Sequence, residues 1–375
     1  KSRIVKLRVD SGIDRNMASK KRSKGTNSFS LSEHFGKIIL ACIAAGSFAI
    51  AFGSEKISQW FSPLSTNSTC LNQFYREVPP ALNKESLKKD SYPLCFNGFN
   101  VLYSGISKTP LWSAEHLDAE RLSVKIKRED NFHEETRVPQ KHRALLSDYR
   151  GSGYDRGHMA PNGDMPNKES QSDSFSLSNM VPQAPKNNQE VWRKLEEATR
   201  AIVTKQKQDV YVVTGPVFEG KRLKTIGQGV IVPTAVYKAV YMPKTGAIGA
   251  YYAPNNNSQQ VKVVSVCYIE EKLGINLFPQ LTEQQKRNVY RLPLTASQVK
   301  PNQKLDYLHW DGESQCEQDL SAEQIQALQD QFKKQKTGSS EPMEAKVPSI
   351  DEETRNAIVK QLVEALVNYF LQIMK

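Results

Sequence analysis

Four stretches rich in valine, isoleucine and tyrosine constrain the fold of this chain most. They occupy residues 101–105, 209–215, 229–242 and 259–269. Because β-branched and aromatic residues in such runs favour extended backbone, each stretch is predicted to be a strand. Residues 187–205 instead repeat apolar side chains at helical spacing, which indicates a helix. We therefore expect an α+β fold in which strands outnumber helices.

The chain is predicted to hold one globular body with appendages at both ends. Its 375 residues are enough for one large domain, and the body is expected at 70–319. Residues 54–69 are rich in serine and threonine and contain proline, which is typical of a linker. Residues 320–375 are expected to form a helical C-terminal extension.

Two capping-box spacings predict the helices of that extension. Ser321 and Gln324 open a polar helix that runs to about residue 336, and Ser349 and Glu352 open a second one. The second helix carries a broad apolar stripe that includes Ile358, Leu362, Leu366, Tyr369 and Ile373. Such a stripe must be covered by the body, by a second copy of the chain in a homodimer, or by a membrane surface.

The positive charge of the chain is concentrated at its start. The formal charge is +11, and residues 1–37 contribute +7 of it with ten Lys/Arg against three acidic residues, which leaves +4 for the rest. We assign no structure to this basic segment and expect it to be disordered. Because the body is only weakly basic, phosphate binding must come from a local cluster of charges.

An apolar segment follows the basic one. Residues 38–52 are almost purely apolar, and the order of positive flank and apolar run is the pattern of exported proteins. About fifteen residues suit a signal-peptide core, and extension beyond Gly53 would suit a membrane anchor. A buried core helix is the third alternative. Under the first two readings of segment 38–53 the body is exported, either membrane-anchored or periplasmic or secreted.

Cysteine usage agrees with an oxidising compartment. Of five cysteines, Cys42 lies in the apolar segment, which leaves four on the exported side and three pairings. Cys70 with Cys95 is the favoured disulfide because the loop-rich stretch between them contains three prolines. Cys267 with Cys316 would be the second, and free buried thiols are the alternative. No Cys/His spacing here indicates a zinc site.

The stretch Gly153-Tyr-Asp-Arg-Gly-His-Met-Ala-Pro161 holds the first candidate catalytic residues. A histidine titrates closest to neutral pH of all side chains, so His158 can accept a proton from water. The guanidinium of Arg156 can bind phosphate through its fork of donors. A general base and an anion-binding group therefore lie two residues apart.

A candidate metal ligand follows about thirty residues later. Asn188 stands at the start of the predicted helix, and Glu196 lies eight residues on, close to the same helix face. An Asn carbonyl is a hard oxygen ligand that suits Mg²⁺, with Mn²⁺ as the alternative ion. Asn is also a common helix cap, so capping is the competing role for Asn188.

Taken together, these motifs resemble the DNA/RNA non-specific endonuclease family. The shared motifs, in the family's order and spacing, are DRGHMAP, NMVPQ, NQEVWRKLE and VVTGPVF. The resemblance covers about residues 95–285, with further matches at 232–238 and 274–279. It implies a ββα-metal fold with a central, mainly antiparallel sheet, in which a strand pair bearing the histidine packs against a helix bearing the asparagine.

The resemblance also implies a role for each site residue. His158 matches the general base, Asn188 the direct metal ligand and Arg156 a phosphate-contacting arginine. Asn179 matches an asparagine that supports the site, and Glu196 a carboxylate that holds water on the metal. Two further positions are Asp155, which completes the motif, and Arg128, which aligns loosely with a second arginine.

The implied activity is hydrolysis of DNA and RNA with one divalent cation and 5′-phosphate products. Because all of these groups address the phosphate backbone, we expect no base reading and no need for a 2′ hydroxyl. Two alternatives remain open: a nucleic-acid-binding protein without turnover, and a phosphodiesterase of small substrates. The partners are then DNA and RNA, with the membrane as a further partner if segment 38–53 is uncleaved.

The remaining polar and aromatic residues of note are given structural roles. Four histidines of the body, His116, His133, His142 and His309, are expected at the surface or as polar core residues. Trp192 and Leu195 are expected to pack the metal-binding helix onto the sheet. The run 214–216 is expected to end a strand behind the site.

Overall fold

The computed structural model describes residues 70–335. The predicted apolar segment 38–53, the linker 54–69 and the helix opening at Ser349 lie outside these residues. Within 70–335 we find no helix that is both long and apolar enough to cross a membrane.

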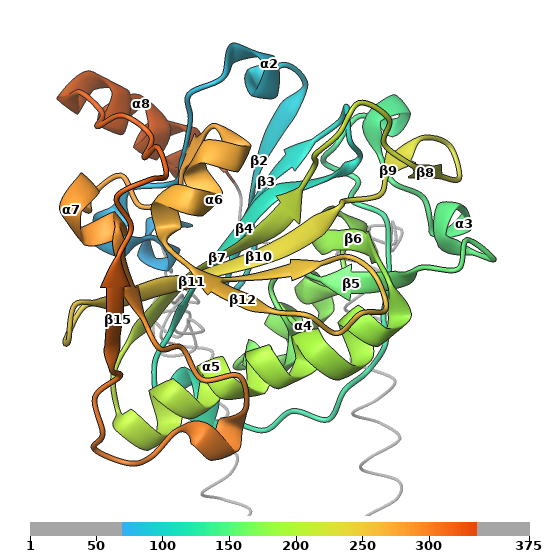
Figure 1. Cartoon of the computed structure of the whole chain (residues 1–375). Coiled ribbons are helices and arrows are strands. Elements are labelled where there is room, and N and C mark those ends of the chain that lie inside the picture. Colours follow the sequence, from blue (N-terminus) through green and yellow to red (C-terminus); the bar gives the residue numbers. More distant parts are fainter. Residues whose placement is uncertain (1–69, 336–375) are drawn as a thin grey trace, which may run out of the picture. The chain divides into compact units, whose positions relative to one another are not determined.

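A seven-stranded antiparallel sheet is the centre of the fold (Figure 1). Its strand order is β12-β11-β10-β7-β4-β3-β2, and every neighbouring pair is antiparallel. The strands are β2 (Ser91–Cys95), β3 (Asn100–Ser104), β4 (Thr109–Leu117), β7 (Val210–Val217), β10 (Ala235–Met242), β11 (Ala247–Pro254) and β12 (Lys262–Val264). The expected α+β fold with a central antiparallel sheet is confirmed.

Four two-stranded sheets and a set of helices surround it. The strand pairs are β1 (Ala81–Leu82) with β13 (Ile275–Asn276), β5 (Asp155–His158) with β6 (Met180–Gln183), β8 (Thr225–Ile226) with β9 (Val230–Ile231), and β14 (Asn288–Tyr290) with β15 (Tyr307–Trp310). The α-helices are α2 (Glu85–Lys88), α3 (Leu146–Tyr149), α4 (Lys168–Ser174), α5 (Arg193–Gln206), α6 (Val266–Leu273), α7 (Glu283–Lys286) and α8 (Ala322–Lys333). The 3₁₀ turns are η1 (Cys70–Gln73), η2 (Tyr75–Glu77), η3 (Arg121–Ser123), η4 (Gln140–His142), η5 (Asn162–Asp164), η6 (Leu177–Asn179) and η8 (Ala296–Gln298).

Alternate residues of β10 enter two different hydrophobic cores, one on each face of the sheet. Tyr237 and Tyr241 pack with apolar side chains of η1, α6 and α8. Val236 and Val240 pack with apolar side chains of α5. Because successive side chains of a strand point to opposite faces, β10 is buried along its whole length. Figure 1 shows α5 on one side of the sheet and α6 and α8 on the other.

Two of the predicted strands are shortened or divided in the structure. The stretch 259–269 is a strand only to Val264, because the side chain of Ser265 caps α6 by accepting from the Tyr268 amide. The stretch 229–242 divides into β9 and β10, with Pro233 between them. The run 214–216 lies at the end of β7, which finishes at Val217, as expected.

Both predicted disulfides are present, so the free-thiol alternative is wrong. Cys70 pairs with Cys95, and Cys267 pairs with Cys316. The first joins η1 to the end of β2, and the second joins α6 to the segment before α8.

The capping box that opens α8 is also formed. The hydroxyl of Ser321 accepts from the Gln324 amide, and the Gln324 side chain accepts from the Ser321 amide. Phe332 of this helix is buried against the rings of Phe74 and Trp112. The part of the C-terminal extension that the structure describes is therefore anchored to the core through Phe332.

Candidate active site

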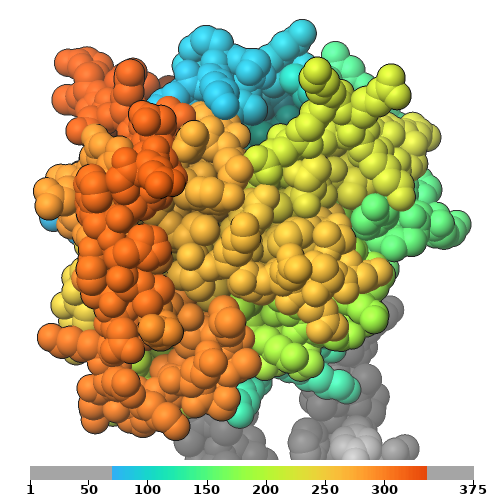
Figure 2. Space-filling view, viewed as in Figure 1, coloured from blue at the N-terminus to red at the C-terminus, as the bar shows by residue number. Residues whose placement is uncertain are grey.

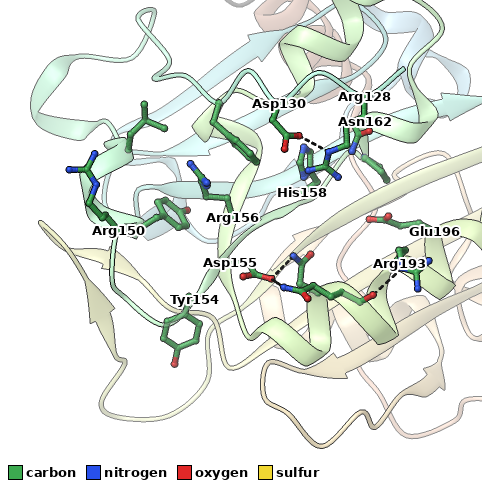
Figure 3. Close-up of a pocket in the computed structure, with 16 residues that line it drawn as sticks. Arg128, Asp130, Arg150, Tyr154, Asp155, Arg156, His158, Asn162, Arg193 and Glu196 are labelled. Carbon is green, nitrogen blue, oxygen red and sulfur yellow. Dashed lines mark hydrogen bonds and ion pairs between the residues drawn. The ribbon is translucent and has the colours of Figure 1, made fainter. Parts of the chain in front are cut away.

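A cleft of about 920 Å³ opens between the β5–β6 strand pair and the start of α5 (Figure 3). Four arginines and three carboxylates line it, together with His158 and Asn188. The charged residues are Arg128, Asp130, Arg150, Asp155, Arg156, Arg193 and Glu196. The local cluster of positive charge that a weakly basic body requires is therefore present.

The pairing of β5 with β6 places Asp155, Arg156 and His158 along β5. Its register pairs Asp155 with Gln183 and His158 with Met180. Gly157 is required between them, because a Cβ at this position would overlap the side chain of Gln183.

His158 is buried and stays neutral near pH 7. Its side chain packs edge-on against Phe175, with ring centroids 5.0 Å apart, and lies beside Phe132. Burial, followed by the charges of Arg128 and Arg156, lowers the pKa of His158 to about 3. Its Nε2 has no hydrogen-bond partner among residues 70–335. The imidazole is therefore in the form that accepts a proton.

Two arginines flank the imidazole and are held by aromatic rings. The guanidinium of Arg156 lies 4.0 Å from the ring centroid of Phe132, and that of Arg128 lies 5.4 Å from that of Phe175. Arg128 also forms an exposed ion pair with Asp130, at 2.6 Å. The loosely aligned Arg128 thus lines the same cleft as the motif arginine (Figure 3).

Asn188 lies on a single π-helical segment, η7 (Asn187–Trp192), that precedes α5. The N-cap residue is Lys186, and the Asn188 side chain donates through Nδ2 to Asp155 Oδ2 at 2.9 Å. Gln189 donates to the same oxygen at 2.8 Å. The helix-cap alternative for Asn188 is therefore wrong. Because its nitrogen is directed at Asp155, the carboxamide offers Oδ1 as a ligand atom.

Glu196 lies on the first turn of α5 and lines the cleft with Asn188. Burial raises the pKa of its carboxyl to about 7, and the charges of Lys238 and Arg200 oppose this rise. A carboxylate with such a pKa is one that gains from a nearby cation.

The family can now be assigned from the sequence as a whole. Residues 79–284 match the family model described as DNA/RNA non-specific endonuclease. The chain belongs to this family. The members of this family are hydrolases that depend on a metal ion, so a cation is expected to bind residues of the cleft.

Three relatives illustrate the match. The chain is 35% identical over 242 residues to Nuclease C1 of Cunninghamella echinulata var. echinulata, which covers 58% of this chain and 90% of the relative. It is 37% identical over 205 residues to mitochondrial Nuclease EXOG of Danio rerio, covering 49% of this chain and 60% of the relative. It is 37% identical over 182 residues to human mitochondrial Endonuclease G, covering 44% and 59%. The match thus spans about three fifths of the two mitochondrial proteins.

The donor atoms in the cleft fit the hard cation that such a family requires. Asn188 contributes a neutral carbonyl oxygen and Glu196 a carboxylate, and oxygen ligands of this kind suit Mg²⁺. One other cluster of ligand-type side chains occurs among residues 70–335, at Cys267, Glu270 and Cys316. Its two cysteines are joined as a disulfide, so they offer no thiolates.

Asn179 lies behind the cleft rather than in its lining. It is fully buried, and its Oδ1 accepts from Ser113 Oγ and the Ala160 amide at 2.8 and 2.9 Å. Its Nδ2 donates to the carbonyls of Ala160 and Ser174. All four hydrogen-bonding positions of the carboxamide are therefore used to join η6 to β4, to the end of α4 and to the segment that follows His158.

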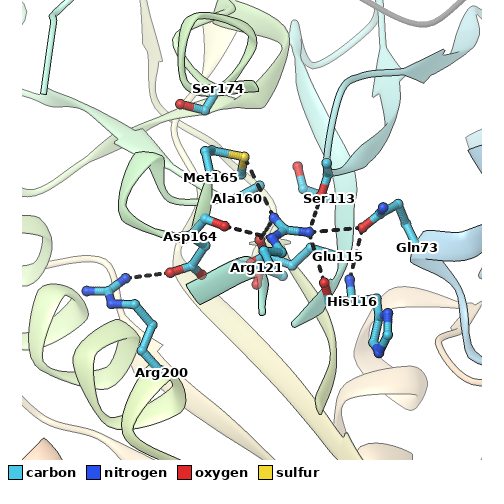
Figure 4. Close-up of polar contacts among 12 residues, drawn as sticks. Gln73, Ser113, Glu115, His116, Arg121, Ala160, Asp164, Met165, Ser174 and Arg200 are labelled. Carbon is cyan, nitrogen blue, oxygen red and sulfur yellow. Dashed lines mark hydrogen bonds and ion pairs between the residues drawn. The ribbon is translucent and has the colours of Figure 1, made fainter. Parts of the chain in front are cut away.

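A buried charge network under the site was not predicted from the sequence (Figure 4). The carboxylate of Asp164 accepts a hydrogen bond from Arg200 Nη1 at 2.6 Å. The backbone carbonyl of Asp164 accepts one from Arg121 Nε at 2.7 Å. Arg121 also forms an ion pair with Glu115, at 3.3 Å. Because Arg200 lies one helical turn after Glu196, the network ties α5 to the loop that follows His158. A buried Asp and Arg 36 residues apart leave no signal in a single sequence.

The four other histidines among residues 70–335 lie outside the lining of the cleft. His116 stacks on Tyr211, and His142 forms a hydrogen bond with Tyr92. His133 bonds a backbone carbonyl through Nδ1, and His309 is exposed. Their positions agree with the structural roles expected for them.

Proposed function

We propose that this chain is a sugar-non-specific endonuclease that hydrolyses phosphodiester bonds of DNA and RNA and leaves 5′ phosphates. The observation that supports it most is the meeting of three kinds of group in one cleft. These are an unpartnered imidazole nitrogen, the oxygen donors of Asn188 and Glu196, and four arginines.

His158 is the proposed general base. Its neutral imidazole can take a proton from a water molecule as that water attacks phosphorus in line with the departing 3′ oxygen. Arg156, supported on the Phe132 ring, can bind the phosphate through two donors of its guanidinium. Arg128 offers a second guanidinium in the same cleft.

Asn188 is the proposed direct ligand of a divalent cation, either Mg²⁺ or Mn²⁺, and Glu196 is proposed to hold water on that cation. When bound, the cation would act as a Lewis acid that stabilises the negative charge developing on the phosphate and on the departing oxygen. Because the Asn188 Nδ2 donates to Asp155, the Oδ1 of Asn188 would be the atom that binds the cation. Asn179 acts as a positioning residue through its four hydrogen bonds.

The proposed substrates include both nucleic acids because the site's groups address the phosphodiester. Contacts to phosphate position a duplex or a single strand without carrying sequence information. None of the proposed roles requires a 2′ hydroxyl. RNA and DNA should therefore both be cut.

We propose that the enzyme acts outside the cytoplasm, since its two disulfides persist in oxidising compartments. Whether the segment 38–53 anchors it in the membrane or is cleaved can be read from a nuclease assay on membrane and soluble fractions. Activity in the membrane fraction would support the anchor, and activity in the soluble fraction would support the cleaved signal.

The assignment is tested by incubating purified protein with Mg²⁺ and either plasmid DNA or RNA. We expect both to be degraded, and His158→Ala to lower kcat by about 10²- to 10⁴-fold, the usual contribution of a general base. Unchanged cutting by the variant would refute the role of His158. Binding of nucleic acid without any cutting by the parent would support the non-catalytic alternative.

A phosphodiesterase of small substrates is excluded or supported by the choice of substrate. We expect a long duplex to be cut far faster than a dinucleotide or a synthetic phosphodiester. The reverse order would favour the small-substrate enzyme.

A further inference from the structure

A second surface with exposed aromatic and basic side chains lies at the far end of α5 from the cleft (Figures 1 and 2). We call it the β15 surface. It consists of Arg291, Leu294, Lys300, Lys304, Tyr307, Leu308 and Trp310. Tyr307 and Trp310 are 52% and 50% exposed, which is unusual for large aromatic residues.

The pairing of β14 with β15 places both rings on one face of this ribbon. Trp310 pairs with Asn288 and Tyr307 pairs with Tyr290, with a register shift between Val289 and Tyr290. Since positions 288 and 290 of one strand point to the same side, their partners share that side. Without the irregularity, residues 307 and 310 would point to opposite faces.

The two rings are also held in place. The Tyr307 ring meets the Tyr290 ring edge-on, with centroids 5.6 Å apart. The guanidinium of Arg287 lies 5.3 Å from the ring centroid of Trp310. Rings that are fixed yet half-exposed offer stacking surfaces at a low entropic cost.

A groove of about 390 Å³, lined in part by Asp306 and Leu308, borders the strand that carries the two rings and is positively charged. Its lining has three cations, Arg291, Lys300 and Lys304, and one carboxylate, Asp306. The ion pair between Arg291 and Asp306 is exposed, with the two atoms 3.7 Å apart, so it is weak. The groove therefore fits a negatively charged ligand.

The groove is joined directly to the helix that carries the site. Lys205 Nζ donates to the Ala296 carbonyl at 2.7 Å, and Gln206 Nε2 donates to the Gln303 carbonyl at 2.7 Å. The 14 residues of α5 cover about 21 Å, so a polymer bound at the cleft can reach the groove. The β15 surface also lies beyond residues 79–284, which the family model matches.

We infer that the β15 surface binds unpaired nucleotides of the substrate strand that lie outside the cleft. Stacking rings beside a basic groove is the combination that binds single-stranded nucleic acid, because every base has a π face and every nucleotide carries a phosphate. The inference rests on the proposed function for its biological setting. Its binding chemistry rests on the aromatic and charged groups alone.

The direct test measures binding of a fluorescently labelled 30-nucleotide single-stranded DNA to the His158→Ala protein by anisotropy. Removing both rings, as Tyr307→Ser with Trp310→Ser, should weaken binding at least fivefold. Lys300→Gln with Lys304→Gln should lower the slope of log K against log salt by about 1.4 in magnitude. The matched controls, Ile106→Ser and Lys89→Gln, change equally exposed residues elsewhere and should alter neither quantity.

Tryptophan fluorescence gives a second readout. Stacking of a base on Trp310 should quench part of the emission when the strand is added, and this quenching should disappear in Trp310→Phe. Unaltered affinity, salt slope and quenching in the surface variants would overturn the inference. A change of oligomeric state in the ring variant, with DNA affinity unchanged, would assign the surface to a second copy and would also overturn it.

The nuclease assay separates this inference from the proposed function. With His158 intact, the ring and lysine variants should cut long single-stranded DNA with a raised KM and should cut a small synthetic phosphodiester like the parent. If the parent cuts nothing yet the surface variants lose affinity, the proposed function fails and the binding surface stands. If cutting of long strands is the same in all variants, the surface inference fails alone.

Discussion

The imidazole of His158 lies beside two phenyl rings and two guanidinium groups, and these neighbours decide its protonation. An exposed histidine would be partly charged near pH 6.5, whereas this one stays neutral well below that pH. The same neighbours bind phosphate in the proposed mechanism. One set of residues therefore keeps the base unprotonated and attracts the substrate.

The lowered pKa of His158 makes the stability of the metal-free protein depend on pH. Below pH 6.5 the unfolded chain binds a proton at residue 158 that the folded chain excludes down to about pH 3, so stability falls as pH falls. This group alone contributes about 1.4 kcal/mol per pH unit in that window. We expect His158→Gln to reduce the slope of unfolding free energy against pH by this amount, as measured by urea unfolding in EDTA between pH 6 and 4. Equal slopes for the two proteins would show that His158 titrates normally.

Asn188 should matter for metal dependence far more than for stability. Its side chain is half-buried and makes one hydrogen bond to Asp155, so Asn188→Ala should cost about 1 kcal/mol of stability. Losing the oxygen ligand should raise the Mg²⁺ concentration for half-maximal activity at least tenfold. Gln189→Ala is the matched control, because Gln189 bonds the same Asp155 oxygen from an exposed position. Equal effects of the two variants on metal dependence would contradict the ligand role.

At the scale of elements, two parts of the fold form the site: the β5–β6 strand pair and the start of α5. The π-helical turn before α5 rotates Asn188 relative to a regular helix, and such turns are frequent at functional sites. The hydrogen bond from Asn188 to Asp155 joins the two pieces at the cleft. The ion pair of Arg200 with Asp164 joins them underneath.

That underlying ion pair gives a prediction for the helix. Arg200→Ala leaves the carboxylate of Asp164, which is only 2% exposed, without its partner, so stability should fall by about 3 kcal/mol. Since α5 carries Glu196, kcat should fall while KM for nucleic acid changes little. Arg200→Lys should recover part of both losses. Urea unfolding and steady-state kinetics measure the two effects, and a change confined to KM would contradict a positioning role.

At the scale of the molecule, the sheet separates two cores with different tasks. The core that contains α5 supports the cleft, and the opposite core contains η1, α6 and α8. Both disulfides join elements of the opposite core, through η1 and α6. Covalent stabilisation is therefore placed away from the chemistry.

The disulfide between Cys70 and Cys95 should accordingly affect stability and leave catalysis nearly unchanged. Its 25-residue separation corresponds to a loop entropy of about 3.5 kcal/mol in the unfolded chain. We expect Cys70→Ala with Cys95→Ala to lower the free energy of unfolding by that amount. The kcat of the folded fraction on DNA should stay within about twofold of the parent. A large loss of kcat at full folding would show that η1 is coupled to the site.

The sequence by itself determined the local features: the main strands, the helix at 187–205, the cap of α8 and the residues of the DRGH and NQ-x-x-W motifs. These depend on side-chain chemistry over a few residues, or on spacings shared with a family. The sequence favoured both disulfides but left free thiols as an alternative, which the structure excluded. Stretches without a strong local pattern, such as β4 and β11, were not predicted. The residues after Ser265 were predicted to be a strand but form α6, because Ser265 caps that helix.

Only the tertiary structure decided how the site residues act. It showed that Asn188 bonds Asp155 instead of capping a helix, and that Asn179 is consumed by four hydrogen bonds. The neutrality of His158, the Arg200–Asp164 pair and the shared face of Tyr307 and Trp310 likewise depend on which distant segments meet. The physical reason is that burial, charge proximity and strand register are properties of the packed chain, and no short stretch of sequence contains them.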